Sequence, residues 1–458
     1  MTNTITSEPL HFPDGAISSP YEAEQYIKSL KKFSLDQVAS PDWMKQRSVI
    51  EKLNVQAHQS AQAQQDEFVV DLLLSYFKVP VLIEELLTLD VWITSVFKKQ
   101  VSKFSELQAS PKCYFVLFHI STLSNLLQIV FYHKETISQV ADLLLDLGDY
   151  CLQKLITLSS CNPLSIFSYA QADAMTDKLQ YIMYGHAINC LFLLRFITDA
   201  RDDLPLSVPH YFLSVRDLPC LVVHSLESRF WVVMNREKRS RMTWNGSKFE
   251  VDNDISIIHK VEATLYLILH NLFCTTAIGQ KYEITGSRKD SLLKVSSLIN
   301  SNYLDQLPVL IDIQSHLEQI TFLQPQSSSS SFLHVGVVEE PQFMSDLARN
   351  DRVIEVAVSH IPSFFNQESL KELTDVAQLY TAPGVAEVLE RPRCGDCGAP
   401  AKLRCSQCKA EWYCDRTCQQ RAWKRHKHGC KKVAEALKEE AKQLAEEQVG
   451  TGLINELD

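Results

Sequence analysis

The feature that most constrains this chain is a cluster of eight soft metal ligands within residues 394–430. The ligands fall into four successive pairs, and within each pair a spacer of two or three residues lets both members reach one ion. Structural zinc takes four Cys or His ligands and closes its coordination shell, so eight ligands predict two structural zinc ions and no open metal position for catalysis. The ligands are Cys394, Cys397, Cys405, Cys408, Cys414, Cys418, His426 and Cys430.

Spacing alone does not say which four ligands share an ion, and His428 is an alternative to His426. A disulfide framework is the other interpretation of clustered cysteines, and it needs an oxidising compartment. Residues 1–10 lack a basic start followed by an apolar run, so we expect no export signal. The six cysteines outside the cluster are therefore expected to be reduced thiols.

This stretch resembles the MYND-type zinc finger. The resemblance implies a cross-brace, in which alternating pairs of ligands share an ion. RING fingers are the nearest alternative, but they usually place two residues between their last two cysteines, where this chain has gaps of three. By the MYND pattern, one ion takes Cys394, Cys397, Cys414 and Cys418, and the other takes Cys405, Cys408, His426 and Cys430.

Composition bounds the rest of the chain. Its 458 residues suggest two to four domains, and a hydrophobic content of 45% is sufficient for a packed core. The net charge of −10 disfavours a chain that coats nucleic acid or an anionic membrane. No apolar stretch approaches the roughly 18 residues that span a bilayer, so we expect no transmembrane segment.

Apolar residues recur at three- and four-residue steps through most of the chain, which is the pattern of amphipathic helices. Leu82, Leu86 and Leu89 show it within residues 81–97. One stretch, residues 241–251, is typical of strands, with Asn245-Gly246 as a hairpin turn. The expected helical segments are 21–33, 50–77, 81–97, 112–133, 136–158, 168–199, 210–228, 255–277, 288–301 and 308–323.

Prolines at positions 80, 219 and 308 each open an apolar segment, and two of these follow an alanine-containing helix. This arrangement resembles armadillo-type repeats, which stack into a solenoid. The fold class is therefore predicted as mainly α: an armadillo-like helical solenoid followed by a small C-terminal double-zinc finger. An irregular helical domain is the alternative. We divide the chain into a flexible tail (1–19), the helical domain (20–324), a Ser-rich linker (325–340), a short helical segment (341–390), the finger (394–430), and a C-terminal helix and tail (431–458).

The surface of the finger is basic, with twelve Lys or Arg against three Asp or Glu in residues 391–432. Phosphate contacts alone give weak, salt-sensitive binding, whereas Trp and Tyr are enriched in protein interfaces, so protein docking is favoured and no nucleic acid is expected. Tyr413 is expected in the small core. In peptide-binding members of the family, a groove between hairpin and helix receives proline-containing ligands. The candidate docking residues are Ser406, Trp412, Gln419 and Trp423.

Seven further stretches resemble those MYND proteins that assemble outer and inner axonemal dynein arms for motile cilia. The resemblance implies a non-enzymatic co-chaperone in the cytoplasm, including dynein assembly particles, centriolar satellites or the apical region of ciliated cells. It implies as partners a leucine-rich-repeat CS-domain co-chaperone, heat-shock chaperones and an immunophilin-type prolyl isomerase, with dynein intermediate and heavy chains as clients. The stretches start at Glu51, Lys78, Phe131, Arg195, Leu218, Leu304 and Glu390.

Two other kinds of MYND protein are alternatives. A nuclear transcriptional corepressor acting through MYND–peptide binding would carry chromatin modules or a basic import signal, and residues 238–241 are a slight candidate for such a signal. A SET-domain methyltransferase would carry an Asn-His-Ser-Cys motif and a glycine-rich cofactor loop, and the chain shows neither. We therefore do not expect an enzyme.

Overall fold

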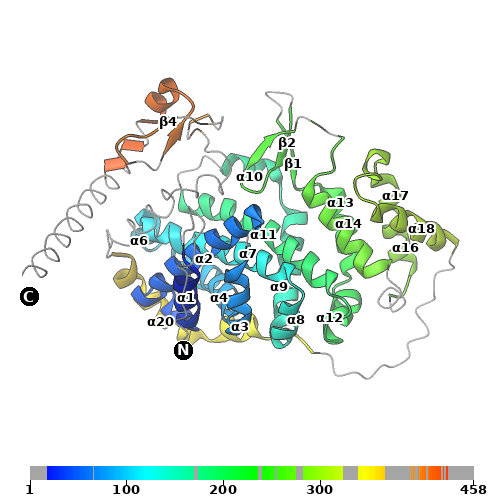
Figure 1. Cartoon of the computed structure of the whole chain (residues 1–458), viewed down its shortest axis with the longest axis horizontal. Helices are drawn as coiled ribbons and strands as arrows, with labels where there is room; N and C mark the ends of the chain where they lie inside the picture. Colours follow the sequence, from blue (N-terminus) through cyan, green and yellow to red (C-terminus); the bar gives the residue numbers. More distant parts are fainter. Residues whose placement is uncertain are drawn as a thin grey trace, which may run out of the picture.

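Figure 1 shows the computed structural model of the chain. The first described helix and the next long helix each begin with a serine cap followed by a proline. The side chain of Ser19 accepts a hydrogen bond from the backbone N–H of Glu22, and Pro20 occupies the first helical position. Ser40 and Pro41 repeat this arrangement at the next long helix. Such caps satisfy free N–H groups, and proline loses no hydrogen bond in a first turn.

The structure describes residues 18–366, except 65, 170–173, 236–239, 253, 255, 275–281 and 323–338, and residues 394–431, except 395, 398–400, 402, 409–410, 424–425 and 428–429. The α-helices up to residue 199 are α1 (Pro20–Ser29), α2 (Pro41–Ala63), α3 (Phe68–Ser75), α4 (Val79–Trp92), α5 (Lys98–Gln100), α6 (Ser105–Ala109), α7 (Pro111–Tyr132), α8 (Glu135–Gln139), α9 (Leu144–Ser160), α10 (Pro163–Tyr169) and α11 (Met175–Asp199). Those that follow are α12 (Ser207–His210), α13 (Leu218–Ser228), α14 (Lys260–Phe273), α16 (Gly286–Leu293), α17 (Val295–Leu298), α18 (Val309–Phe322), α19 (Phe343–Arg349) and α20 (Asp351–Asn366). Short 3₁₀ turns are η1 (Leu35–Gln37), η3 (Ala141–Leu143) and η5 (Ser301–Tyr303), and π turns are η2 (Ile93–Phe97) and η4 (Tyr211–Val215).

The long helices stack in two rows that follow the order of the chain (Figure 1). In one row α2 contacts α7, α7 contacts α11, α11 contacts α14, and α14 contacts α18. In the other row α4, α9, α13 and α16 contact one another in succession, and each also packs on a helix of the first row. A stack in which units contact their neighbours is a solenoid, so the described chain is mainly α and armadillo-like.

The helix expected over residues 50–77 is two helices. Helix α2 ends at Ala63 because Gln64 adopts a left-handed conformation, with φ 52° and ψ 40°, and its N–H bonds back to Ala61. Helix α3 begins at Phe68 and packs on α1 and α2. No glycine or proline lies at the break. The apolar period continues across it, and the prediction from that period therefore joined the two helices into one.

A three-stranded antiparallel sheet is inserted between α13 and α14, with strand order β1 (Val232–Asn235), β2 (Ser240–Trp244) and β3 (Phe249–Val251). The expected hairpin is β2–β3, and its Gly246 has φ +113°, which favours glycine. Strand β1 was not predicted, because a four-residue apolar run cannot be told from a helix segment by periodicity.

Two helices are long and apolar enough to cross a membrane by length and composition, within Lys112–Tyr132 and Met175–Asp199. This corrects the expectation that no apolar stretch approaches that length. In both helices 61% of the most apolar window is buried within the protein. They are α7 and α11, which pack on each other and on α4 and α9 of the other row, as core helices of a solenoid do.

The segment after residue 338 returns to the first helices instead of leading on from α18. Helix α19 contacts α4, and α20 contacts η1, α6 and η2. Its Ala357, Ile361 and Phe365 are buried in the main core. The expected short helical segment of residues 341–390 is therefore, as far as residue 366, part of the solenoid.

The other predicted boundaries fall partly outside the described residues. Ser18 is buried and donates its N–H to Gln56, so the folded part begins before residue 20. Outside the described residues lie residues 1–17 of the predicted tail, the rest of the 341–390 segment from residue 367, and the C-terminal helix and tail beyond residue 431.

Candidate metal centre

A short β-hairpin and a helical turn position the eight predicted ligands. Strands β4 (Leu403–Arg404) and β5 (Trp412–Tyr413) pair antiparallel, and the N–H of Cys405 donates to the Glu411 carbonyl at 2.8 Å. Residues 416–423 are helical. The Asp415 carboxylate caps this helix by accepting a hydrogen bond from the Cys418 N–H at 2.7 Å. Cysteines at the hairpin ends thereby face those on the helix.

The ligand atoms gather in two separate groups of four, and within each group they all lie within 4.8 Å of one another. In the second group the Nε2 atom of His426 lies 3.4 Å from the Sγ atoms of both Cys405 and Cys408. A tetrahedral ion with zinc–sulfur bonds of about 2.3 Å needs sulfur atoms roughly 3.8 Å apart. The observed Sγ–Sγ separations of 3.4–3.7 Å fit that geometry. The groups are Cys394, Cys397, Cys414, Cys418 and Cys405, Cys408, His426, Cys430.

The two groups therefore interleave along the chain as the cross-brace does. His426 belongs to the second group, whereas His428 lies outside the described residues. The residues present fit two structural zinc ions, each closed by four protein ligands. With both shells full, zinc supplies folding energy here and leaves no position for water or substrate.

Groups behind the ligands hold them in place. The Nδ1 atom of His426 lies 3.2 Å from the Glu411 carboxylate, which orients the ring with Nε2 toward the sulfur atoms. Arg421 donates to the Cys418 Sγ at 3.0 Å and pairs with Asp396 at 2.9 Å. Sequence reasoning missed Glu411, Arg421 and Asp396. One signal in the sequence could have drawn attention to Asp396 and Glu411: they are two of only three acidic residues in the basic stretch 391–432.

Two thiols are prepared for metal by the backbone around them. Burial raises the pKa of the Cys394 thiol, but hydrogen bonds from the amides of Cys397, Cys414 and Asp396 outweigh it and bring that pKa to about 6. Burial likewise raises the pKa of the Cys405 thiol. Hydrogen bonds from the Cys408 amide, the His426 side chain and the Gln407 amide outweigh this effect and bring that pKa to about 6. Each group thus holds one ready thiolate at neutral pH, and protons compete with metal as the pH falls through 6.

The sequence profile of the MYND finger matches residues 394–430, the range that holds both groups. Residues 394–430 of this chain therefore form a MYND finger. Along most of its length it is similar to the zinc finger MYND domain-containing protein 10 homolog of Drosophila melanogaster, with 25% identity over 450 residues, which cover 90% of this chain and 99% of the relative.

Similarity to Tudor domain-containing protein 1 is confined to a short stretch. The mouse protein is 43% identical over 49 residues, which cover 11% of this chain and 4% of the relative. The human protein is 36% identical over 70 residues, 14% of this chain and 6% of the relative. No solved structure matches the chain.

The MYND finger has a small core of its own. Tyr413 is fully buried, as expected, beside Ala422 and five of the cysteines. The ring of His426 meets Tyr413 and Trp423 edge-on, with centroids 6.2 and 5.9 Å apart. Trp423 nevertheless keeps 38% of its surface exposed. A large side chain of this kind is available for contact with a partner.

The structure brings together two of the four candidate docking residues. Gln419 and Trp423 line a small surface pocket on the finger helix with Arg416 and Gln420. Ser406 is exposed in the turn after β4, and Trp412 is half-buried on β5, and neither lines that pocket. The use of all four in docking stays a prediction.

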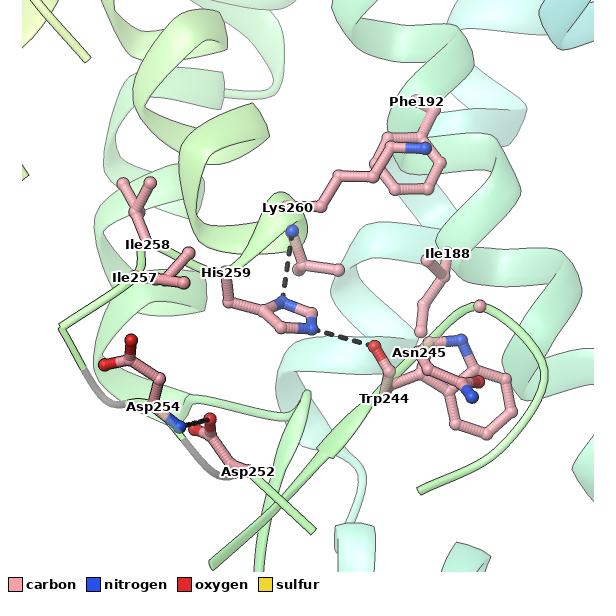
Figure 2. A pocket seen from close by; sticks show the side chains of 12 residues that line it. Ile188, Phe192, Trp244, Asn245, Asp252, Asp254, Ile257, Ile258, His259 and Lys260 are labelled. Atoms are coloured by element: carbon pink, nitrogen blue, oxygen red, sulfur yellow. Dashed lines mark hydrogen bonds between the residues drawn. The ribbon is translucent and has the colours of Figure 1, made fainter. Parts of the chain in front are cut away.

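A larger pocket of about 390 Å³ lies in the solenoid, between α11, the β2–β3 hairpin and the start of α14 (Figure 2). In it His259 donates from Nε2 to the Trp244 carbonyl at 2.8 Å, and its Nδ1 accepts from the Val261 N–H at 3.2 Å. Burial lowers the pKa of His259, which favours this neutral form. Both ring nitrogens are engaged in holding the hairpin to α14, so the histidine has a structural role.

At the other side of this pocket the ammonium group of Lys260 lies 4.4 Å from the centroid of the Phe192 ring (Figure 2). Burial, and then the nearby Arg195, lower the pKa of Lys260. The described lining residues include no Ser, Thr or Cys nucleophile. The arrangement is a cation–aromatic contact between two stacked helices, and it gives no indication of a reaction.

Proposed function

We propose that this chain is a non-enzymatic cytoplasmic adaptor and co-chaperone for the pre-assembly of outer and inner axonemal dynein arms, with the MYND finger as its protein-docking module. The observation that supports docking is the exposed Trp423 beside two full zinc shells. A finger whose ligands are all committed to structure can act only through its surface. A partly exposed tryptophan among basic residues is a typical anchor of a protein interface.

The ciliary part of the proposal rests on the solenoid. Similarity to the Tudor proteins is confined to 11–14% of this chain, so a finger of this kind occurs in unlike proteins and does not by itself specify a process. Similarity to the MYND domain-containing protein 10 homolog covers 90% of the chain and thus the helical repeats as well. The helical repeats supply the large surface that an assembly factor needs to hold a client.

The proposed partner of the finger is a leucine-rich-repeat CS-domain co-chaperone. Heat-shock chaperones and an immunophilin-type prolyl isomerase would act in the same pathway, and dynein intermediate and heavy chains would be the clients. The proposed location is the cytoplasm, at dynein assembly particles, centriolar satellites or the apical region of ciliated cells. A nuclear corepressor that binds peptides through the finger is the alternative.

Removal of the chain from multiciliated cells tests the proposal. We expect outer- and inner-arm dynein chains to be missing from the axonemes while the axonemal microtubules persist, and the full chain to restore them. A tagged rescuing chain should be cytoplasmic. Normal dynein arms in its absence would contradict the proposal, and a nuclear chain with altered transcription would favour the corepressor.

A further inference from the structure

Helix α20 makes its contacts with residues very distant in the sequence. The Nδ1 of His360 lies 3.0 Å from the backbone carbonyl oxygen of Asp36, a separation of 324 residues. The ring of Phe365 stacks on Trp92 with centroids 6.1 Å apart, and the Lys112 ammonium lies 6.0 Å from the same ring. Residues of η1, α4 and α7 thus contact this one helix.

The pattern of α20 is that of a helix bound in a groove. Its buried residues Ala357, Ile361 and Phe365 recur at four-residue steps, with Ile354 and Val358 partly buried on the same face. The opposite face, including Glu355 and Val356, is exposed. Spacing of this kind is how amphipathic helices bind in apolar grooves of separate proteins.

The preceding helix adds an anchor of another kind. The Asp146 carboxylate, at the start of α9, accepts the backbone N–H of Phe343 at 2.9 Å. Partly buried apolar side chains of α19 pack against the main core, but none is fully buried. The fully buried contacts therefore come from α20.

We propose that η1, η2 and α6 form a helix-binding groove whose ligand is the chain's own α20, held by side-chain contacts and exchangeable with a free copy of residues 343–366. The occupant is identified by the structure itself, since α20 fills the groove. Through this contact the described solenoid chain ends, at residue 366, against η1, η2 and α6 rather than beside α18.

A cut in the linker tests this in the full chain. A protease site inserted between Ser329 and Ser330 allows cleavage after folding. We expect the two fragments to co-elute in size-exclusion chromatography, and an excess of synthetic peptide 343–366 to displace the C-terminal fragment. Fragments that separate at once would overturn the proposal, as would a C-terminal fragment that the peptide never displaces.

Variants identify the anchors. The double variant Ile361→Ala with Phe365→Ala should weaken association of the fragments by roughly 30-fold or more, as expected for loss of hot-spot side chains. Val356→Ala, on the exposed face of the same helix, is the matched control and should change nothing. Circular dichroism of the uncut variants checks their folding. Association that survives the double variant would place the contact elsewhere and overturn the assignment to α20.

Discussion

The finger and the solenoid are stabilised in opposite ways. The finger spans residues 394–430 and its hydrophobic cluster consists of five cysteines, Tyr413 and Ala422. The solenoid buries apolar side chains from nearly every helix in one continuous core. A chain segment too short to exclude water replaces burial with metal coordination, whereas stacked helices obtain burial from their neighbours. Perturbations should therefore act on one region and spare the other.

The largest expected effect is loss of one zinc ligand. Cys394→Ala should unfold the finger, because structural zinc supplies about 10–16 kcal/mol of its folding free energy. Elemental analysis should give about two zinc ions for the parent chain and fewer for the variant. The helical circular-dichroism signal should remain largely intact. Loss of most of that signal would show that the finger and the solenoid fold as one unit.

The reciprocal test removes burial from the solenoid. Leu191→Ala opens a cavity on α11, where Leu191 is fully buried, and should lower the free energy of unfolding by about 2–5 kcal/mol. Zinc content should stay at two ions per chain. Ile311→Ala, at an exposed position on α18, is the control and should cost little. Zinc loss in the Leu191 variant would contradict the independence of the two regions.

Docking should depend on the finger surface without involving its metal. Trp423→Ala should weaken binding to the proposed CS-domain partner by about 2 kcal/mol, a hot-spot-sized loss, with zinc retained. Thr417→Ala, on the same helix but outside the pocket, is the matched control. Calorimetry and zinc analysis on the same protein separate the two roles. Unchanged affinity with zinc retained would remove Trp423 from the interface.

The zinc ligands, one hairpin and the main helices could be predicted from the sequence, because each depends on residues close together in the chain. Short ligand spacers identified the eight ligands, the family resemblance implied their grouping, and Asn245-Gly246 indicated the β2–β3 hairpin. Periodicity identified the main helices and, through repeated proline starts, the solenoid. These features depend on residues near one another in the chain.

Contacts between distant segments were not predictable in the same way. The docking of α20 depends on Trp92 and Asp36, and no pattern within residues 351–366 identifies such partners. The break at Gln64 needs a left-handed residue, and glutamine is not one of the residue types, such as Gly or Asn, that indicate this conformation in a sequence. The support that Glu411 gives His426 exists only once the hairpin has formed. In each case the tertiary fold decides between local options that the sequence leaves open.

The smallest expected effect concerns that support. Glu411 accepts from His426 at Nδ1 and so presents Nε2 to the metal, and loss of such an outer partner typically lowers metal affinity by about 10–100-fold. Glu411→Ala should lower the zinc affinity of the site that contains His426 by a factor close to that range. Glu411→Gln should lose less, because its amide oxygen still accepts the same hydrogen bond and only the charge is removed.

Chelator competition measures these affinities site by site. Gln420→Ala, an exposed change on the finger helix away from the ligands, is the control and should leave both sites unchanged. In the Glu411 variants the zinc affinity of the site that contains His426 should fall, while the site that contains Cys394 should keep its affinity. Equal weakening of both sites would mean that Glu411 acts on the fold of the whole finger. No weakening of either would mean that the ring of His426, packed between Tyr413 and Trp423, is already held in place by its aromatic neighbours.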